Sequence, residues 1–212
     1  MRKELAPEWA LLGLLTQKPM HGYELHRYFT DPSALGQVWY LGLSQMYKLL
    51  KELEGQGYLQ VTVEEQESYP ARKVYHLTPS GRAAFLQWME KPVRNTRLIR
   101  VEFLAKLFLA QLLGSEMIER VIGTQLETCQ AQLARLQEKI EIGDWRLDIG
   151  DGRRACPEPF DFTQDRPSRR AGGEGFEYLI FCFRRGQIQA IIDWLKYCRR
   201  VFMEEERIAN TK

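Results

Sequence analysis

Hydrophobic residues recur every three to four positions over most of this chain and every second position in one short stretch. Residues 5–17 are rich in leucine and predict a largely buried helix, which Lys18 and Pro19 should end. A second short helix is expected over residues 21–31. Residues 36–42 predict a turn region, and we expect its central apolar residues, Val38, Trp39 and Tyr40, to dock on the core.

A third helix is expected between Ser44, a good N-cap, and Gly55, a suitable stop. Its apolar residues fall at the i, i+3, i+4 and i+7 positions of one buried face: Met46, Leu49, Leu50 and Leu53. Its polar side chains fall on the other side: Ser44, Gln45, Tyr47, Lys48 and Lys51. Amide, phenol and ammonium groups can bond base edges and phosphates in a major groove, but an ordinary surface helix presents similar groups.

After Gly57 the period changes to two, because Leu59, Val61 and Val63 alternate with polar residues as in a half-buried strand. Residues 66–71 predict a turn, residues 73–77 a return strand, and Thr78-Pro79 the start of another helix. A hairpin directly after three short helices matches a winged helix-turn-helix plan. Arg72 and Lys73 at the wing should then reach the neighbouring minor groove or DNA backbone.

Four groups of residues resemble the start of a PadR-family transcriptional regulator. They are Pro7-Glu8-Trp9-Ala10-Leu11-Leu12-Gly13-Leu14-Leu15, Met20-His21-Gly22-Tyr23-Glu24-Leu25, Gln45-Met46-Tyr47 with Leu53-Glu54-Gly55-Gln56-Gly57-Tyr58-Leu59, and Tyr75-His76-Leu77-Thr78-Pro79-Ser80-Gly81. The matches run in order over most of residues 5–90, although Leu-Thr-Pro-x-Gly also occurs in other winged-helix families such as MarR. The resemblance implies a homodimeric DNA-binding protein, usually a repressor, which is often released by a phenolic or other aromatic effector.

The C-terminal half predicts long helices. Residues 98–112 form an apolar face (Leu98, Val101, Leu104, Ala105, Phe108 and Leu112), which Gly114-Ser115 should end. Residues 115–142 and 176–202 each carry an apolar stripe at helical spacing. Such helices can pair within one chain, as a monomeric hairpin, or with a second subunit. The resemblance favours a dimer, and we assign its contacts to Ile180, Phe183, Ile188, Ile191, Leu195 and Phe202.

The expected fold is therefore mainly α with a small β-hairpin. Residues 1–92 should form the winged helix-turn-helix, and residues 93–212 a helical dimerisation and effector domain, joined at residues 91–94. Residues 150–173 contain four of the 16 glycines and three of the nine prolines, so they predict a flexible insertion. Their five arginines could form a second nucleic-acid patch, but four interspersed acidic residues favour a solvated loop.

Composition narrows the function without deciding it. Residues 1–90 carry nine Lys and Arg against ten Asp and Glu, which argues against non-specific nucleic-acid binding but allows a local footprint. That balance also keeps open a second function, a winged-helix module that binds protein. The apolar fraction of 44%, and the lack of a signal peptide or an apolar run of membrane length, predict a cytoplasmic protein.

Several polar residues are candidates for chemistry. His21 can be a helix-start residue, a phosphate donor or a buried hydrogen-bonded group, and Tyr23 and Tyr47 can contact phosphate or simply pack. The four cysteines and three histidines lack zinc spacing, and Cys129 and Cys198 lie on apolar stripes, so they should be core thiols. Cys156 falls in the predicted loop. We expect no metal, no cofactor and no enzymatic activity.

Overall fold

The computed structural model describes residues 7–32, 34–65, 71–141 and 174–209. The chain divides into two compact units, of which the first comprises Met1–Gln125 with Cys198–Lys212 and the second Leu126–Tyr197. Most of the described residues are helical, and they include a three-stranded antiparallel sheet. The fold class is therefore the predicted one, mainly α with a small β component.

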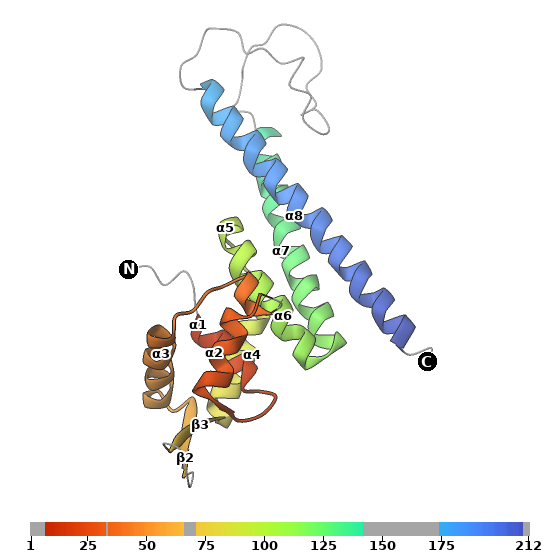
Figure 1. The fold of residues 1–212 in the computed structure, drawn as a ribbon. Helices are drawn as coiled ribbons and strands as arrows, with labels where there is room; N and C mark the ends of the chain where they lie inside the picture. Colours follow the sequence, from red (N-terminus) through yellow and green to blue (C-terminus); the bar gives the residue numbers. More distant parts are fainter. Residues whose placement is uncertain (1–6, 33, 66–70, 142–173, 210–212) are drawn as a thin grey trace, which may run out of the picture. The chain divides into compact units, whose positions relative to one another are not determined.

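The first unit opens with three helices around one core (Figure 1). They are α1 (Pro7–Leu14), α2 (Gly22–Thr30) and α3 (Leu43–Gly55), with a 3-10 turn, η1 (Leu35–Gln37), before α3. The core contains Leu11, Leu12, Leu25, Phe29, Leu35, Leu41, Met46, Leu50 and Leu53. The three predicted helices are thus confirmed, together with most of the buried face of α3.

The segment before α3 packs differently from its prediction. Tyr40 is 73% exposed, so its predicted docking on the core is wrong, and Val38 and Trp39 are only half-buried. Leu35 and Leu41 fill that part of the core instead. The η1 turn sets this register, because the Val38 and Trp39 N–H groups both donate to the Leu35 carbonyl.

Helix α3 ends at Gly55 as predicted, but its start and the turn that follows it differ from the sequence prediction. The N-cap is Gly42, in extended backbone, and Ser44 lies inside the first turn. At the other end the Tyr58 N–H donates to Leu53 O and the Gly57 N–H to Glu54 O, each at 2.9 Å, which is a Schellman motif. Gly57 has φ +75°, so the glycine that turns the chain is Gly57 rather than Gly55.

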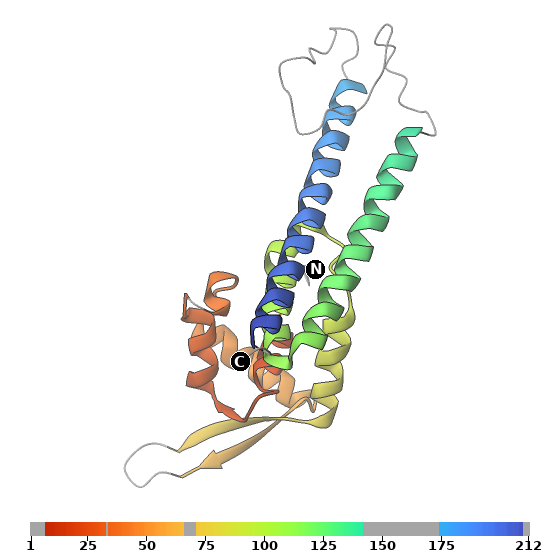
Figure 2. The same cartoon turned by 90° about the vertical axis from the view of Figure 1, so that its right-hand side faces the viewer.

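The sheet has strand order β1-β3-β2, from β1 (Met20–His21), β2 (Leu59–Glu64) and β3 (Arg72–Leu77). The predicted hairpin β2–β3 is confirmed, while β1 was not anticipated. Leu59 pairs with Leu77 at the base of the hairpin and Glu64 with Arg72 at its far end. The expected alternation fails at Val63, which is 60% exposed because the hairpin extends beyond the helices (Figure 2).

Helix α4 (Pro79–Glu90) starts as predicted, with Thr78 as N-cap and proline in its first turn. The Thr78 Oγ1 accepts the Gly81 N–H at 3.1 Å and lies 2.8 Å from the Gly57 carbonyl oxygen. Glycine is required at position 81, because a Cβ there would lie 2.3 Å from the Tyr58 carbonyl oxygen. This Thr78 clasp joins the end of α3, the base of the hairpin and the start of α4.

The next helical stretch buries a different face from the one predicted. It consists of α5 (Thr96–Leu98), a π-helical turn η2 (Ile99–Phe103) and α6 (Leu104–Leu113). The buried residues are Ile99, Phe103, Ala105, Leu107, Leu109 and Ala110, whereas Leu98, Val101, Leu104, Phe108 and Leu112 are half-buried. A π turn inserts one extra residue into the helix and so rotates the buried face of the turns that follow. A prediction that assumes a regular helical period misses this rotation. Gly114, with φ +105°, ends α6 as expected.

Two long helices follow, α7 (Ser115–Glu141) and α8 (Glu174–Ala209). Within the second unit their described parts lie side by side and run in opposite directions (Figures 1 and 2). The buried residues there are Leu126, Cys129, Phe181, Ile188, Ile192 and Leu195. Cys129 and Cys198 are buried, as predicted for core thiols, and burial raises the pKa of the Cys198 thiol.

The predicted insertion at residues 150–173, with its arginines and Cys156, lies outside the described residues. Across the described part of the chain, no helix combines the length and apolarity needed to span a bilayer.

Candidate nucleic-acid interface

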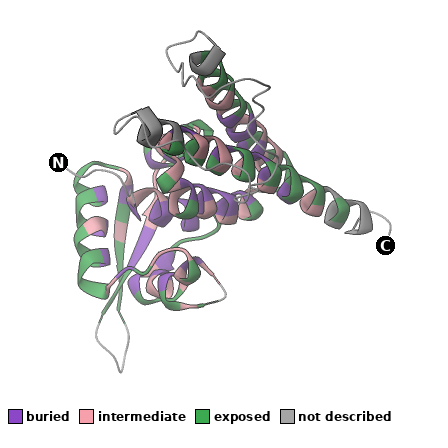
Figure 3. Ribbon diagram, turned by 90° about the horizontal axis from the view of Figure 1, so that it is seen from above, coloured by how far each residue is buried: buried purple, intermediate pink, exposed green. Residues whose placement is uncertain are grey.

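Helix α3 presents a polar face on the side opposite its buried residues. In Figure 3 exposed residues follow one side of this helix and buried residues the other. The exposed set contains all the predicted residues: Ser44, Gln45, Tyr47, Lys48 and Lys51. The Lys48 ammonium lies 4.0 Å from the Glu52 carboxylate, but both side chains are more than half exposed, so this ion pair is weak. The lysine is therefore able to exchange that partner for an external anion.

Tyr47 joins this face to the start of α2. A Cβ built on Gly22 would lie 2.7 Å from both the Cε1 and Oη atoms of Tyr47, so the ring lies directly over that glycine. The ring is still 43% exposed. Tyr75 in β3 is close by, and the pKa of its phenol is raised by burial and secondarily by Tyr47 and Glu54. Tyr47 thus packs on one side and remains available on the other.

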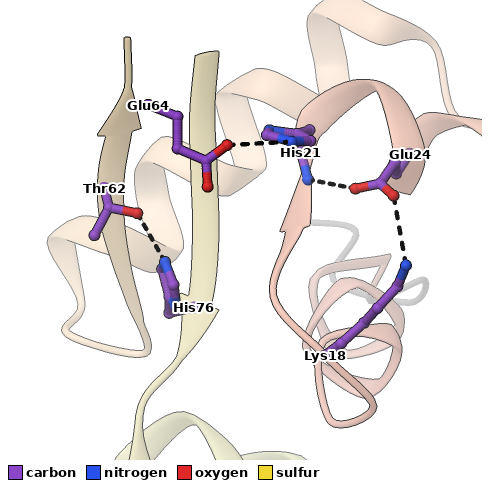
Figure 4. A network of polar contacts seen from close by, with 6 residues as sticks. All are labelled: Lys18, His21, Glu24, Thr62, Glu64 and His76. Atoms are coloured by element: carbon purple, nitrogen blue, oxygen red, sulfur yellow. Dashed lines mark hydrogen bonds and ion pairs between the residues drawn. The ribbon is translucent and has the colours of Figure 1, made fainter. Parts of the chain in front are cut away.

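His21 is the N-cap of α2, which confirms its interpretation as a helix-start residue. Its backbone N–H donates to Glu24 Oε2 at 2.9 Å, and the Lys18 ammonium lies 3.6 Å from Glu24 Oε1 (Figure 4). The hydrogen bond from this N–H is the main reason why the pKa of Glu24 lies below its ordinary value. Burial opposes that shift by raising the pKa, whereas Lys18 lowers the pKa further. The same network reaches the wing, since His21 Nε2 lies 3.7 Å from Glu64 Oε2.

The wing carries the predicted basic pair at its far end. Arg72 and Lys73 are both exposed and pair with Glu64 and Val63 of β2. Between the strands the Thr62 hydroxyl lies 2.8 Å from His76 Nε2 (Figure 4). The turn itself, residues 66–70, lies outside the described residues. His21 lies in β1, which pairs with β3 of the wing. The structure therefore brings His21 and the wing together, and sequence periodicity did not indicate this pairing.

Three further residues of α2, of α3 and of the segment between them are apolar or aromatic and exposed: Tyr23 (69% exposed), Tyr40 (73%) and Leu43 (45%). Tyr23 was a predicted site residue, whereas Tyr40 and Leu43 were not. Leu43 is the first residue of α3, three positions before Met46, so periodicity alone would place it inside. In the structure its side chain is nevertheless exposed.

Among the described residues, no cluster of three or more His, Cys, Asp or Glu side chains is arranged to hold a metal ion. The polar groups gathered here, on α3, the start of α2 and the wing, include amides, hydroxyls and cations, beside the carboxylates of Glu24, Glu52 and Glu64. Amides, hydroxyls and cations donate hydrogen bonds to phosphates and base edges.

Comparisons with known proteins cover both halves of the chain. A family model described as the transcriptional regulator PadR-like family matches residues 11–87, and one described as virulence activator alpha C-term matches residues 99–202. The Bacillus subtilis negative transcriptional regulator PadR is 31% identical over 136 residues, which span 63% of this chain and 72% of that protein.

Solved structures of that Bacillus subtilis protein are also similar. Its complex with operator DNA is 22% identical with a TM-score of 0.41, and the match covers 93% of this chain and 99% of the other. Its complex with p-coumaric acid is 22% identical with a TM-score of 0.36, covering 95% and 98% respectively.

Proposed function

From the premise that this chain belongs to the PadR-like family of transcriptional regulators, we propose that it is a homodimeric repressor that binds a palindromic operator. The observation that carries this proposal is the exposed polar face of α3 beside a wing with two exposed cations. A helix of that kind, the third of the winged helix and the second of its helix-turn-helix, fits the major groove. The proposal places the protein in the cytoplasm, with DNA.

We assign distinct contacts to the residues of this face. The Gln45 amide has the donor and the acceptor needed to pair with an adenine edge, so we assign it to recognition of the base sequence. Lys48 and Lys51, with Ser44 and Tyr47, bind phosphates and fix the register of α3 in the groove. Arg72 and Lys73 reach the adjacent minor groove or backbone.

Two residues at the start of α2 complete the proposed interface. His21 and Tyr23 lie at the N-terminal end of that helix, where a phosphate is favoured by the helix dipole. Residues 1–90 carry slightly more acidic than basic side chains. Binding must therefore depend on these local contacts rather than on the overall charge of the domain.

Dimerisation is assigned to the C-terminal helices, within a functional division into residues 1–92 and 93–212. On α8, Phe183 is 59% exposed, and Leu179 and Tyr197 are similarly exposed. Ile180, Ile191 and Phe202 are half-buried, whereas Ile188 and Leu195 are already buried within the single chain. We therefore assign the partner contacts to Phe183, Ile180, Ile191 and Phe202, and assign Ile188 and Leu195 to packing within the chain.

We also propose that an aromatic small molecule releases the operator. The support is the 31% identity to Bacillus subtilis PadR, a protein whose structure is known with p-coumaric acid. A ligand that prefers the conformation unable to bind DNA lowers operator affinity by its differential affinity for the two states. Titrating p-coumaric acid and related phenolic acids into the operator complex tests this. Unchanged operator affinity across the series would remove the effector from the proposal.

The experiment that tests DNA binding starts from the promoter upstream of the chain's own gene. Fluorescence anisotropy gives the affinity and its salt dependence for the unmodified chain, Lys48→Ala and Gln45→Ala. Lys48→Ala should weaken binding to all duplexes and reduce the salt slope by roughly one unit, because it removes one phosphate contact. Gln45→Ala should instead reduce discrimination between operator variants, at about 1–3 kcal/mol for a bidentate contact.

Lys196→Ala is the matched control, since Lys196 is an exposed lysine on α8. It should leave affinity and salt slope unchanged. Equal behaviour of Lys48→Ala and Lys196→Ala would show that α3 does not lie on the DNA.

A further inference from the structure

The segment between α4 and α5 is non-helical, and its backbone is held by two buried polar side chains. The Val93 N–H donates to Gln125 Oε1 at 2.7 Å, and Gln125 Nε2 donates to the Val93 carbonyl oxygen at 2.9 Å. The side chain of Gln125, in α7, is 1% exposed, and Val93 is 3% exposed. One glutamine amide therefore satisfies both backbone groups of a buried residue outside any helix or strand.

The second buried polar side chain is Lys106 of α6, also 1% exposed. Its ammonium donates to the Lys91 carbonyl oxygen, at the C-cap of α4. It lies 3.4 Å from a Glu102 carboxylate oxygen and 4.7 Å from the centroid of the Trp88 ring. Burial lowers the pKa of Lys106, and Glu102 opposes that shift. An ammonium inside a core needs such partners, because without them its desolvation is too costly.

These contacts belong to four separate elements of the first compact unit: Trp88 on α4, Glu102 in η2, Lys106 on α6 and Gln125 on α7. A flexible hinge would leave its backbone groups to water. Here the Lys91 carbonyl and both backbone groups of Val93 are instead bound by side chains of α6 and α7. An exposed ion pair, between Arg120 and Glu90 at 3.6 Å, adds a weaker link from α7 to the end of α4.

Apolar side chains of similar size would fill the same space at lower desolvation cost, so packing alone does not explain a buried lysine and a buried glutamine. Their hydrogen bonds are directional, and they fix where the backbone of residues 91–93 runs. We propose that Gln125 and Lys106 are positioning residues for DNA binding, which hold the winged helix in one orientation on α6 and α7. This inference rests on the proposed function, a DNA-binding dimer, and identifies what sets its half-site spacing.

The spacing of the half-sites matters because a dimer presents two recognition helices at once. They lie about one turn of the DNA double helix apart, or a multiple of it. If residues 91–93 are fixed, each α3 has one orientation relative to residues 115–125 of α7, which belong to the same compact unit, and one separation of half-sites is preferred. If that joint is loosened, several separations are accepted, each with lower affinity. Spacing selectivity therefore distinguishes positioning from a general contribution to stability.

The half-site is first selected from random DNA. The test then uses the full chain and duplexes that carry this half-site twice, either at the preferred spacing or with two base pairs inserted between the half-sites. The variants are Gln125→Leu and Lys106→Met, which keep size and remove the directional bonds. For the unmodified chain we expect the insertion to weaken binding by about thirtyfold, and for each variant by less than about threefold. Gln111→Leu, at an exposed glutamine on α6, is the matched control and should retain the selectivity of the unmodified chain.

Folded variants that keep the full spacing selectivity would overturn the inference, because a purely structural role lowers the active fraction equally for every duplex. Absence of DNA binding by the unmodified chain would overturn the proposed function as well. Hydrogen exchange of the unmodified chain provides a measurement that needs no variant. The Val93 amide should exchange at least about 100-fold slower than in an unstructured peptide. Exchange of Val93 at the rate of such a peptide would refute a fixed joint.

Discussion

The Tyr47 ring occupies the space that a side chain at Gly22 would need, with its Cε1 and Oη atoms 2.7 Å from where that Cβ would lie. Gly22 begins α2, and Tyr47 is on the exposed face of α3. The two helices therefore approach each other at a point where only hydrogen fits on one of them. The position of a proposed DNA contact is in this way set by a glycine on another helix.

Gly22→Ala should weaken operator binding, roughly threefold to tenfold for one displaced phosphate contact. The new methyl group meets the far end of a half-exposed side chain, so the ring rotates away and the melting temperature changes little. Tyr47→Ala should weaken binding to the same extent, and the double variant should lose no more than either single one. Additive losses in this cycle would mean that Gly22 acts independently of Tyr47.

Gly81→Ala should destabilise the fold by roughly 1–3 kcal/mol, the usual cost of overpacking a tight site. The added methyl group would press on the Tyr58 backbone carbonyl, which a side-chain rotation cannot relieve. Gly123→Ala is the matched control: a Cβ on Gly123, within α7, would have open space around it, so alanine should be neutral or stabilising. Thermal and urea denaturation of both variants measure the difference, and equal stabilities would refute the close contact at Gly81.

Glu24 predicts an acid-dependent contribution to stability. Its pKa is lowered in the folded chain, mainly by the His21 N–H, so the folded state favours the carboxylate. The stabilisation is present above the ordinary pKa of 4.5 and is lost as the pH falls through the lower folded value. Glu24→Gln should therefore be less stable than the unmodified chain near neutral pH, and the difference should shrink in acid. Urea denaturation from pH 7 to pH 3 measures it, with Glu127→Gln, at an exposed carboxylate on α7, as control.

Phe183→Glu should convert the proposed dimer into monomers and remove tight operator binding with it. Phe183 is 59% exposed in the single chain, so a charge there is tolerated by the monomer but not by an apolar interface. Gln189→Glu adds the same charge at an exposed position on another side of α8, away from the stripe that holds Phe183 and Ile191, and should leave the dimer intact. Light scattering at micromolar concentration separates these outcomes, and a monomeric unmodified chain would end the dimer proposal.

Local sequence signals located most of the elements of the winged helix. Apolar spacing identified the helices and the hairpin, and Thr78-Pro79 identified the start of α4, because each signal depends on residues a few positions apart. Non-local features were missed. The two-residue strand β1 is too short to show a period, and it exists through its pairing with Tyr75 and Val74 of β3.

The polar face of α3 was readable from the sequence, since it is the complement of a buried stripe. The exact cap residues were not, because both Gly42 and Ser44 are acceptable starts and both Gly55 and Gly57 acceptable stops. The π turn at Ile99–Phe103 shifted the buried face of α6 without any local sign. Nothing in the pattern indicated that Lys106 and Gln125 would be buried, since both residue types are ordinarily exposed.

The Thr78 clasp has a consequence for the order in which the chain folds. Thr78 and Gly57 are 21 positions apart, whereas the ion pair between Arg199 and Glu119 in the same compact unit joins residues 80 positions apart. Closing a short loop costs less conformational entropy than closing a long one, and it is faster. We therefore expect α3, the hairpin and the start of α4 to acquire protected amides while α8 is still leaving the ribosome. Pulse-labelling hydrogen exchange on stalled chains of increasing length would detect that protection before residue 199 has been added.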